Sequence, residues 1–309
     1  MIPAGRSVWR RLTPREIRML CYLGVLLGVA IWRFAPRPWH PAHTVEVPHY
    51  VIQSSATELQ TAEAGQALEM LYSAYTSRFE GWAQFQPAHP KLKVRLFRDR
   101  AEFRRINPGL GWAEAFYRKP YCQAYYEAAE INPCHALLHE AVHQLNEEVT
   151  GVALAQWLEE GLATYFSTSR MISNRLAVGR IDVNTYPVWW LDELAVSPHL
   201  AENLRNGSVI PLLAIITNRG GPSLNRRVNL YYLHWWTLAH FIFEDSQYGQ
   251  RAGFLVRQGG GLESFEATIG PVEKVQVEWH DYVRRLKAAW TAGDVRFFRD
   301  GILPEPAKS

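Results

Sequence analysis

Two histidines and a glutamate lie within five consecutive residues of the chain, which read His139-Glu140-Ala141-Val142-His143. Residues four apart on a helix share a face, so both imidazole rings can reach one metal ion. The carboxylate between them can act as general base toward a water molecule that the metal activates. We therefore predict a Zn²⁺ site with His139 and His143 as ligands and Glu140 as a catalytic residue. A helix with two histidines at this spacing by chance is the alternative for the pentapeptide alone.

A further carboxylate is needed downstream, because a catalytic zinc usually has three protein ligands and a water. Residues 157–166 read WLEEGLATYF, and their apolar spacing predicts a second amphipathic helix. It offers two carboxylates, Glu159 and Glu160. One position along a helix rotates a side chain by about 100°, so only one of them can face the metal.

The two segments together resemble the gluzincins, the peptidase-MA-like group of zinc metallopeptidases that includes the aminopeptidase N family. In that family the HExxH helix is followed by a helix reading WLNEGFA, whose glutamate before the glycine is the third zinc ligand. The resemblance implies that Glu160, in WLEEGLA, is the third ligand here. Positions 144–159, sixteen residues, separate His143 from Glu160, slightly fewer than in the family, so Glu159 stays the alternative.

The same families have a tyrosine on a later helix, whose hydroxyl stabilises the oxyanion of the reaction. Small or apolar residues follow it at fixed spacings. Tyr232 fits this pattern better than Tyr231, which has Thr237 at the sixth position after it. The resemblance thus implies that Tyr232 is catalytic, and an aromatic core residue is the alternative. The strand that binds a free amine in aminopeptidases has no counterpart here, which leaves endopeptidase, exopeptidase and non-peptidase amide hydrolase open.

Four neighbouring side chains have weaker claims on the site. His135 lies one helical turn before His139 and is expected in a second shell around the metal or on the surface. Thr164 lies one turn after Glu160 and could orient a ligand. His234 and His240 are expected to be ordinary packed or exposed residues.

Composition limits the classes of function. The chain has 309 residues, 48% of them hydrophobic, which allows one large domain or two small ones. Its net charge of +3 comes mainly from the first forty residues, so no nucleic-acid partner is expected. A peptide or protein substrate is expected instead. The alternative hypotheses are a non-catalytic binding protein with a structural zinc and a metal-free scaffold that presents aromatic grooves.

The N-terminus has the pattern of a membrane anchor. Residues 1–18 contain five arginines and one acid, and an uncharged run from Met19 to Trp32 follows. We predict a cytoplasmic basic tail at 1–18 and an uncleaved signal anchor at 19–35, with a cleaved signal peptide as the alternative. The remainder is then periplasmic or extracellular, where Cys122 and Cys134 could form a disulfide.

The order of the strands and helices expected from the sequence predicts an α+β fold, in which a small mixed sheet is followed by a mainly helical half. The resemblance implies that it is zincin-like. We expect a linker at 36–48, a gluzincin-like metallopeptidase domain at 49–295 and a tail at 296–309. Periodicity predicts strands at 49–53, 91–97 and 121–128, with helices at 57–79 and 99–106. Helices are predicted from residue 134 onward at 134–148, 156–169, 209–217, 229–245, 262–268 and 273–290.

Overall fold

The computed structural model describes residues 13–34, 39–82, 89–111, 113–294 and 298. It divides into two compact units, Met1–His40 and Pro41–Ser309, and each is described by itself. The predicted cytoplasmic tail lies outside the described residues except for its last six positions. Of the predicted C-terminal tail, only Phe298 is described.

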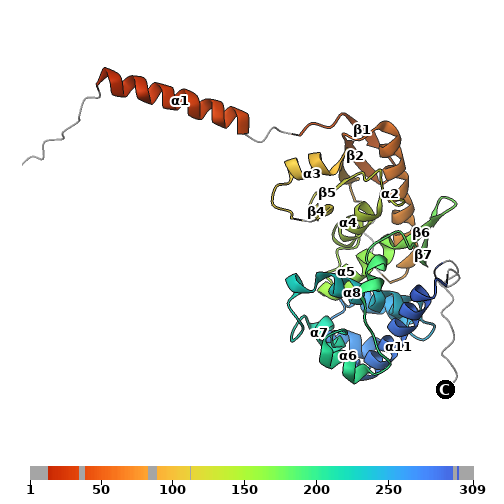
Figure 1. The fold of residues 1–309 in the computed structure, drawn as a ribbon. Coiled ribbons are helices and arrows are strands. Elements are labelled where there is room, and N and C mark those ends of the chain that lie inside the picture. The colour runs from red at the N-terminus through yellow and green to blue at the C-terminus, as the bar shows by residue number, and fades with distance from the viewer. Residues whose placement is uncertain (1–12, 35–38, 83–88, 112, 295–297, 299–309) are drawn as a thin grey trace, which may run out of the picture. The chain divides into compact units, whose positions relative to one another are not determined.

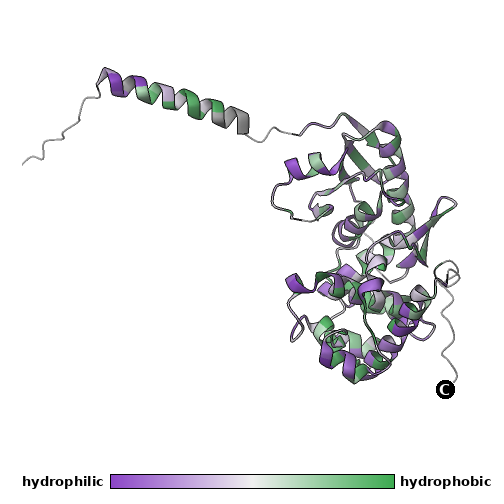
Figure 2. Ribbon diagram, viewed as in Figure 1, coloured by the Kyte–Doolittle hydropathy of each residue, from purple (hydrophilic) through white to green (hydrophobic). Residues whose placement is uncertain are grey.

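The described part of the first unit contains one long helix, α1 (Pro14–Phe34), which includes most of the segment predicted as a membrane anchor. Figure 2 shows its hydrophilic first turns giving way to a more hydrophobic stretch. Nowhere in the described parts of the chain does a helix have both the length and the apolar character required to cross a membrane. Membrane anchoring therefore stays a prediction.

A mixed five-stranded sheet forms one half of the second unit (Figure 1). Its strands are β1 (His43–Glu46), β2 (Tyr50–Ser54), β3 (Leu92–Phe97), β4 (Ala115–Arg118) and β5 (Tyr121–Tyr125), in the order β1-β2-β3-β5-β4. The central strands β2, β3 and β5 are parallel, whereas β1 and β4 run antiparallel at the two edges. Alternation of buried and exposed residues along β3 follows the sequence LKVRLF, as predicted.

Two helices connect the parallel strands, α2 (Glu58–Arg78) and α3 (Arg100–Ile106). Thr57 begins α2 with a capping box, in which its hydroxyl accepts from the Gln60 amide and the Gln60 side chain accepts from the Thr57 amide. Asp99 caps α3 through the Glu102 amide. Both helices were predicted within two residues at each end.

The remaining helices form the second half of this unit, together with the hairpin β6 (Ser169–Ile172) and β7 (Arg175–Ile181). The helices are α4 (His135–Leu145), α5 (Gln156–Ser167), α6 (Leu200–Asn206), α7 (Leu212–Thr217), α8 (Val228–Glu244), α9 (Gly249–Arg257), α10 (Leu262–Thr268) and α11 (Val272–Thr291). Short turns are the π-helical η1 (Asn146–Thr150) and the 3₁₀ helices η2 (Val188–Glu193) and η3 (Leu224–Arg226). The prediction of an α+β fold is thus confirmed.

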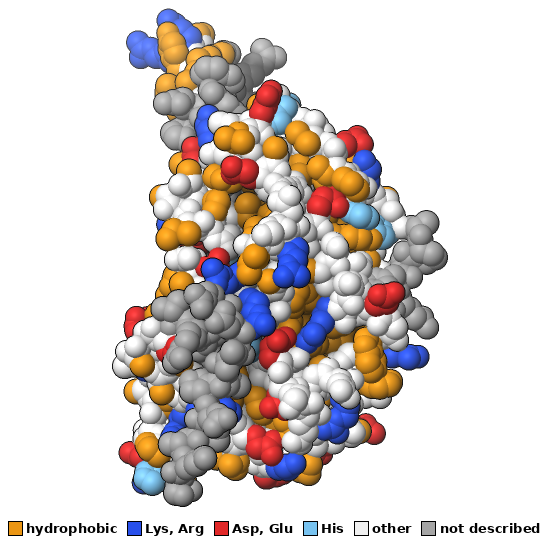
Figure 3. Space-filling view, turned by 90° about the vertical axis from the view of Figure 1, so that its right-hand side faces the viewer, with side chains coloured by type: hydrophobic (Ala, Val, Ile, Leu, Met, Phe, Trp, Pro, Cys, Tyr) orange, Lys and Arg blue, Asp and Glu red, His pale blue; other side chains and the backbone are white. Residues whose placement is uncertain are grey.

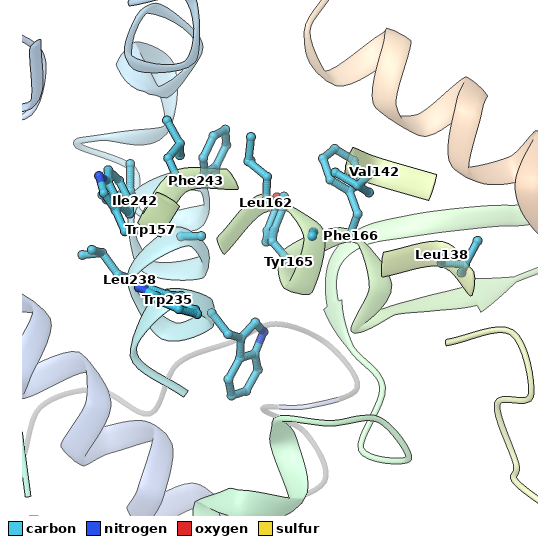
Figure 4. Packing of buried hydrophobic residues seen from close by; sticks show 14 of the residues in the cluster. Leu138, Val142, Trp157, Leu162, Tyr165, Phe166, Trp235, Leu238, Ile242 and Phe243 are labelled. Carbon is cyan, nitrogen blue, oxygen red and sulfur yellow. The ribbon is translucent and has the colours of Figure 1, made fainter. Parts of the chain in front are cut away.

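The core of this unit runs between α4, α5 and α8 (Figure 4). Its buried apolar side chains include Leu138, Val142, Trp157, Leu162, Tyr165, Phe166, Trp235, Leu238, Ile242 and Phe243. Burying such large side chains stabilises the fold by roughly 1.5–3 kcal/mol each. The three helices are therefore rigidly placed relative to one another.

Several sequence predictions differ from the structure. The predicted linker 36–48 contains β1, a four-residue edge strand too short for periodicity to reveal. The half predicted to be mainly helical contains the hairpin β6–β7, and α6 and α9 were not predicted. Cys122 and Cys134 are both buried and free, so no disulfide joins them.

On the face shown in Figure 3, Lys and Arg side chains lie beside Asp and Glu side chains and hydrophobic ones.

Candidate metal centre

Helix α4 presents the two motif histidines on one face. Its apolar residues, including Leu138 and Val142, are buried in the core on another face, which fixes the helix rotation. His139 is 2% exposed, and the His139 and His143 ring centroids lie 5.1 Å apart. The spacing of four residues therefore places both imidazoles together, as predicted.

Helix α5 delivers the third side chain. The π-helical turn η1 extends α4, and residues 151–155 then lead into α5. The Ala155 amide donates to the Gly259 carbonyl, and the Trp157 indole donates to the Gly260 carbonyl, which fixes the first turn of α5. This short connection places Glu160 within 4 Å of both histidines, whereas Glu159 contacts His143 alone.

His139, His143 and Glu160 each offer one ligand atom, and these atoms all lie within 4.8 Å of one another. Glu160 Oε2 lies 3.3 Å from His139 Nε2 and 3.9 Å from His143 Nε2. Two imidazole nitrogens and a carboxylate oxygen form a donor set that zinc takes in catalytic sites.

The cluster also contains a buried polar atom without a hydrogen-bond partner. Glu160 Oε2 is buried, and none of the described residues forms a hydrogen bond with it. Leaving such an atom unsatisfied costs about 1–3 kcal/mol, and more for a charged group. A cation between the three side chains would remove this cost, so the residues fit a metal ion.

The carboxylate of Glu159 lies on the outer side of His143. Its Oε1 is 3.4 Å from His143 Nδ1, and its side chain is 45% exposed. A carboxylate beside the second ring nitrogen orients a metal-binding histidine. By contrast, Nδ1 of His139 is buried and has no hydrogen-bond partner among the described residues.

The charge state of the cluster follows from these contacts. Burial lowers the pKa of His143, but hydrogen bonding to Glu159 and the charges of Glu160 and Glu140 outweigh it and raise the pKa to about 9. Burial raises the pKa of Glu160, but His139, His143 and Tyr232 together outweigh burial and lower it. The cluster therefore holds a carboxylate and, without a metal, a protonated His143 at neutral pH.

Glu140 points from α4 toward the edge strand of the sheet. Its Oε2 accepts a hydrogen bond of 2.7 Å from the backbone amide of Tyr117 in β4. This contact fixes the carboxylate against β4, which is an edge strand of the sheet.

Tyr232 of α8 also reaches the cluster. Its ring centroid lies 6.0 Å from that of His139, and its hydroxyl interacts with the Glu160 carboxylate. Burial and the charge of Glu160 raise the pKa of Tyr232 well above the ordinary tyrosine value. The hydroxyl therefore stays protonated at neutral pH and can donate a hydrogen bond.

One aromatic side chain at the site was not singled out from the sequence. Tyr186 lies between β7 and η2, and its ring centroid is 6.0 Å from that of His139 and 6.4 Å from that of Tyr232. The nearby signal in the sequence is the cluster Tyr186-Pro187-Val188-Trp189-Trp190, but nothing in its spacing points to the histidines.

The weaker candidates have structural roles. His135 is buried, not exposed, and its Nδ1 donates to the Ser167 carbonyl. The Thr164 hydroxyl donates to the carbonyls of Glu160 and Gly161, so it does not orient the Glu160 carboxylate. His240 is packed, with its two ring nitrogens bonded to the Gly179 carbonyl and the Tyr282 hydroxyl.

A hollow of about 390 Å³ adjoins the cluster. It lies between the start of α5, η3 and the start of α8, and is lined by Gln156, Glu160, Leu224, Asn225, Val228, Tyr232 and Trp235. Glu160 is the one charged residue among these.

Comparisons with models of known protein families and with curated protein sequences find no match for this chain. Because a fold alone does not define an activity, function must be inferred from the residues of the site.

Proposed function

We propose that this chain is a zinc-dependent hydrolase that cleaves peptide bonds. The observation that carries the proposal is the convergence of His139, His143 and Glu160 within 4.8 Å, with Glu140 beside them. Three protein ligands leave a coordination position open, as catalytic zinc sites require, whereas structural zinc sites have four protein ligands.

Zinc, when bound, would lower the pKa of a water molecule to about 7 and polarise a carbonyl. Glu140 would accept a proton from the attacking water and pass it to the leaving amine. The Tyr117 amide holds the Glu140 carboxylate at 2.7 Å, so the base is already oriented. Tyr232 donates a hydrogen bond to the carbonyl oxygen as negative charge develops on it.

Two features favour a peptide over another amide. The strand β4, whose amide contacts Glu140, is an edge of the sheet, and edge strands can pair with an extended peptide. The hollow beside Glu160 has room for a side chain of that peptide.

The N-terminal segment completes the proposal. We infer that residues 19–35 anchor the chain in a membrane, with residues 1–18 cytoplasmic and the second unit periplasmic or extracellular. The arginines that flank the uncharged run support this orientation. Carbonate extraction of membranes tests it: the full chain should stay in the pellet, and a chain beginning at Pro41 should be released.

The test of the activity combines zinc content with hydrolysis of a quenched-fluorescence peptide library. The full chain should bind about one zinc and cleave some library peptides. Glu140→Gln should keep its zinc and lose turnover, whereas His143→Ala should lose both. A folded, zinc-supplied parent protein that binds no zinc would contradict the proposal, as would normal turnover by Glu140→Gln.

A further inference from the structure

The ring of Tyr186 is held between aromatic neighbours. The His135 ring meets it edge to face with centroids 4.2 Å apart, and the Trp190 ring stacks on it at 5.7 Å. His135 is itself fixed by its hydrogen bond to the Ser167 carbonyl at the end of α5. Contacts on two sides restrict the rotamer of Tyr186. A side chain that holds its hydroxyl in a fixed place at a site requires such a restriction.

The hydroxyl of Tyr186 is available, in contrast to that of Tyr232. It has no hydrogen-bond partner among the described residues, and it is not one of the buried atoms that lack one. It is therefore in contact with solvent, although the residue as a whole is half-buried. The Tyr232 hydroxyl, by contrast, interacts with the Glu160 carboxylate.

The charges around Tyr186 favour a donor rather than an acceptor. Burial raises the pKa of its phenol well above the ordinary value, and the charges of Glu140 and Glu160 raise it further. The position of Tyr186 comes from its ring, whose centroid lies 6.0 Å from that of His139 in the cluster. A neutral phenol at this position is stabilised when its hydroxyl donates a hydrogen bond to an oxygen that carries negative charge.

We propose that the Tyr186 hydroxyl donates a hydrogen bond to the carbonyl oxygen of the bond being cleaved, so that Tyr186 is a second catalytic tyrosine beside Tyr232. The inference rests on the proposed hydrolase function. Tyr186 lies in the turn before η2 and Tyr232 lies on α8, and their ring centroids are 6.4 Å apart. Their hydroxyls can therefore approach one oxygen from two directions. Oxyanion sites commonly combine two such donors, which together hold the charge as it forms.

The test compares Tyr186→Phe with Tyr232→Phe and with the control Tyr121→Phe. Tyr121 begins β5, outside the cluster, and its hydroxyl also has no described hydrogen-bond partner. Each variant is measured for kcat and KM on a cleaved peptide and for zinc affinity by chelator competition. Each zinc-loaded variant is also titrated by calorimetry with a phosphinic peptide, whose tetrahedral anionic group imitates the charged oxygen.

For Tyr186→Phe we expect kcat and phosphinic-peptide affinity to fall by a similar factor, on the order of 100-fold, with KM and zinc affinity unchanged. The control should match the parent protein in all four quantities. Unchanged kcat and phosphinic affinity in Tyr186→Phe would overturn the role of Tyr186 and leave the hydrolase proposal standing. Loss of zinc affinity together with phosphinic affinity would overturn it in favour of a structural role. A parent protein that binds zinc but neither cleaves peptides nor binds the phosphinic peptide would overturn both.

Discussion

Gly161 lies so close to Trp235 that a Cβ atom at position 161 would stand 2.9 Å from the Trp235 carbonyl oxygen and 3.1 Å from the Ala239 methyl group. The glycine thus lets the backbones of α5 and α8 approach closely. Glu160 precedes it on α5, and Tyr232 lies one turn before Trp235 on α8. The approach of Tyr232 to Glu160 therefore depends on the absence of a side chain at Gly161.

We expect Gly161→Ala to reduce the free energy of unfolding by about 1–3 kcal/mol, because the added methyl group would clash with backbone atoms that cannot move without shifting the helix. Urea unfolding of the zinc-free protein measures this change. Gly24→Ala in α1 is the matched control, since Gly24 is also a helix-interior glycine and has nothing within 4 Å of an added Cβ atom. Stability equal to the parent protein in Gly161→Ala would contradict the close approach.

Removing the Tyr232 hydroxyl should separate catalysis from metal binding. Tyr232→Phe keeps the ring against His139 but cannot donate to a developing negative charge. We expect kcat to fall by about 100- to 1,000-fold, with zinc affinity nearly unchanged. Steady-state kinetics measures kcat, and chelator competition measures zinc affinity. An equal loss in zinc affinity would mean that the hydroxyl supports the ligand Glu160 and not the reaction.

The two adjacent glutamates of α5 should differ sharply in their effect on zinc. Glu160→Gln removes a ligand and should abolish stoichiometric zinc binding. Glu159→Gln keeps a hydrogen-bonding group near His143 and should lower zinc affinity by about tenfold at most. This is the low end of the effect of a group that orients a metal ligand, and we expect it because the Glu159 side chain is 45% exposed. Chelator competition on both variants decides the matter. The reverse ranking would make Glu159 the ligand.

The residues of the metal cluster could be predicted because their positions follow from local geometry. His139 and His143 need only a helix, and the rule of four residues places them together. Glu160 required the resemblance to gluzincins, since periodicity alone cannot choose between adjacent carboxylates. The structure supplies the missing reason, because contacts of residues 155 and 157 with the chain near Gly259 fix the rotation of α5.

Other features depend on contacts between distant residues, which no local pattern encodes. Tyr186 reaches the cluster because the chain after β7 folds back over α4. No pattern near residue 186 in the sequence therefore predicts that this side chain lies at the site. The hairpin β6–β7 was missed because its tip, Ser173-Asn174, has no glycine although both residues have positive φ values of 47° and 60°. The edge strand β1 is too short to show a period.

Protonation of His143 should link pH to both stability and zinc affinity, in opposite directions. Its pKa in the metal-free folded chain is about 9, above the ordinary value of about 6.5. A raised pKa means that the folded state binds the proton more tightly than the unfolded state. The resulting stabilisation, about 3 kcal/mol at most, is fully present below about pH 6.5 and is lost as pH rises through about 9.

Zinc must displace the same proton, because a histidine binds metal through a neutral ring nitrogen. Zinc affinity should therefore rise with pH between about 6.5 and 9, while the zinc-free protein becomes less stable over the same range. Urea unfolding after chelator treatment and chelator competition, both repeated across this range, measure the two trends. In His143→Gln the loss of stability with rising pH should shrink, because no proton is taken up at that position. A parent protein whose zinc affinity stays level from pH 6.5 to 9 would show that His143 is already neutral in the metal-free site.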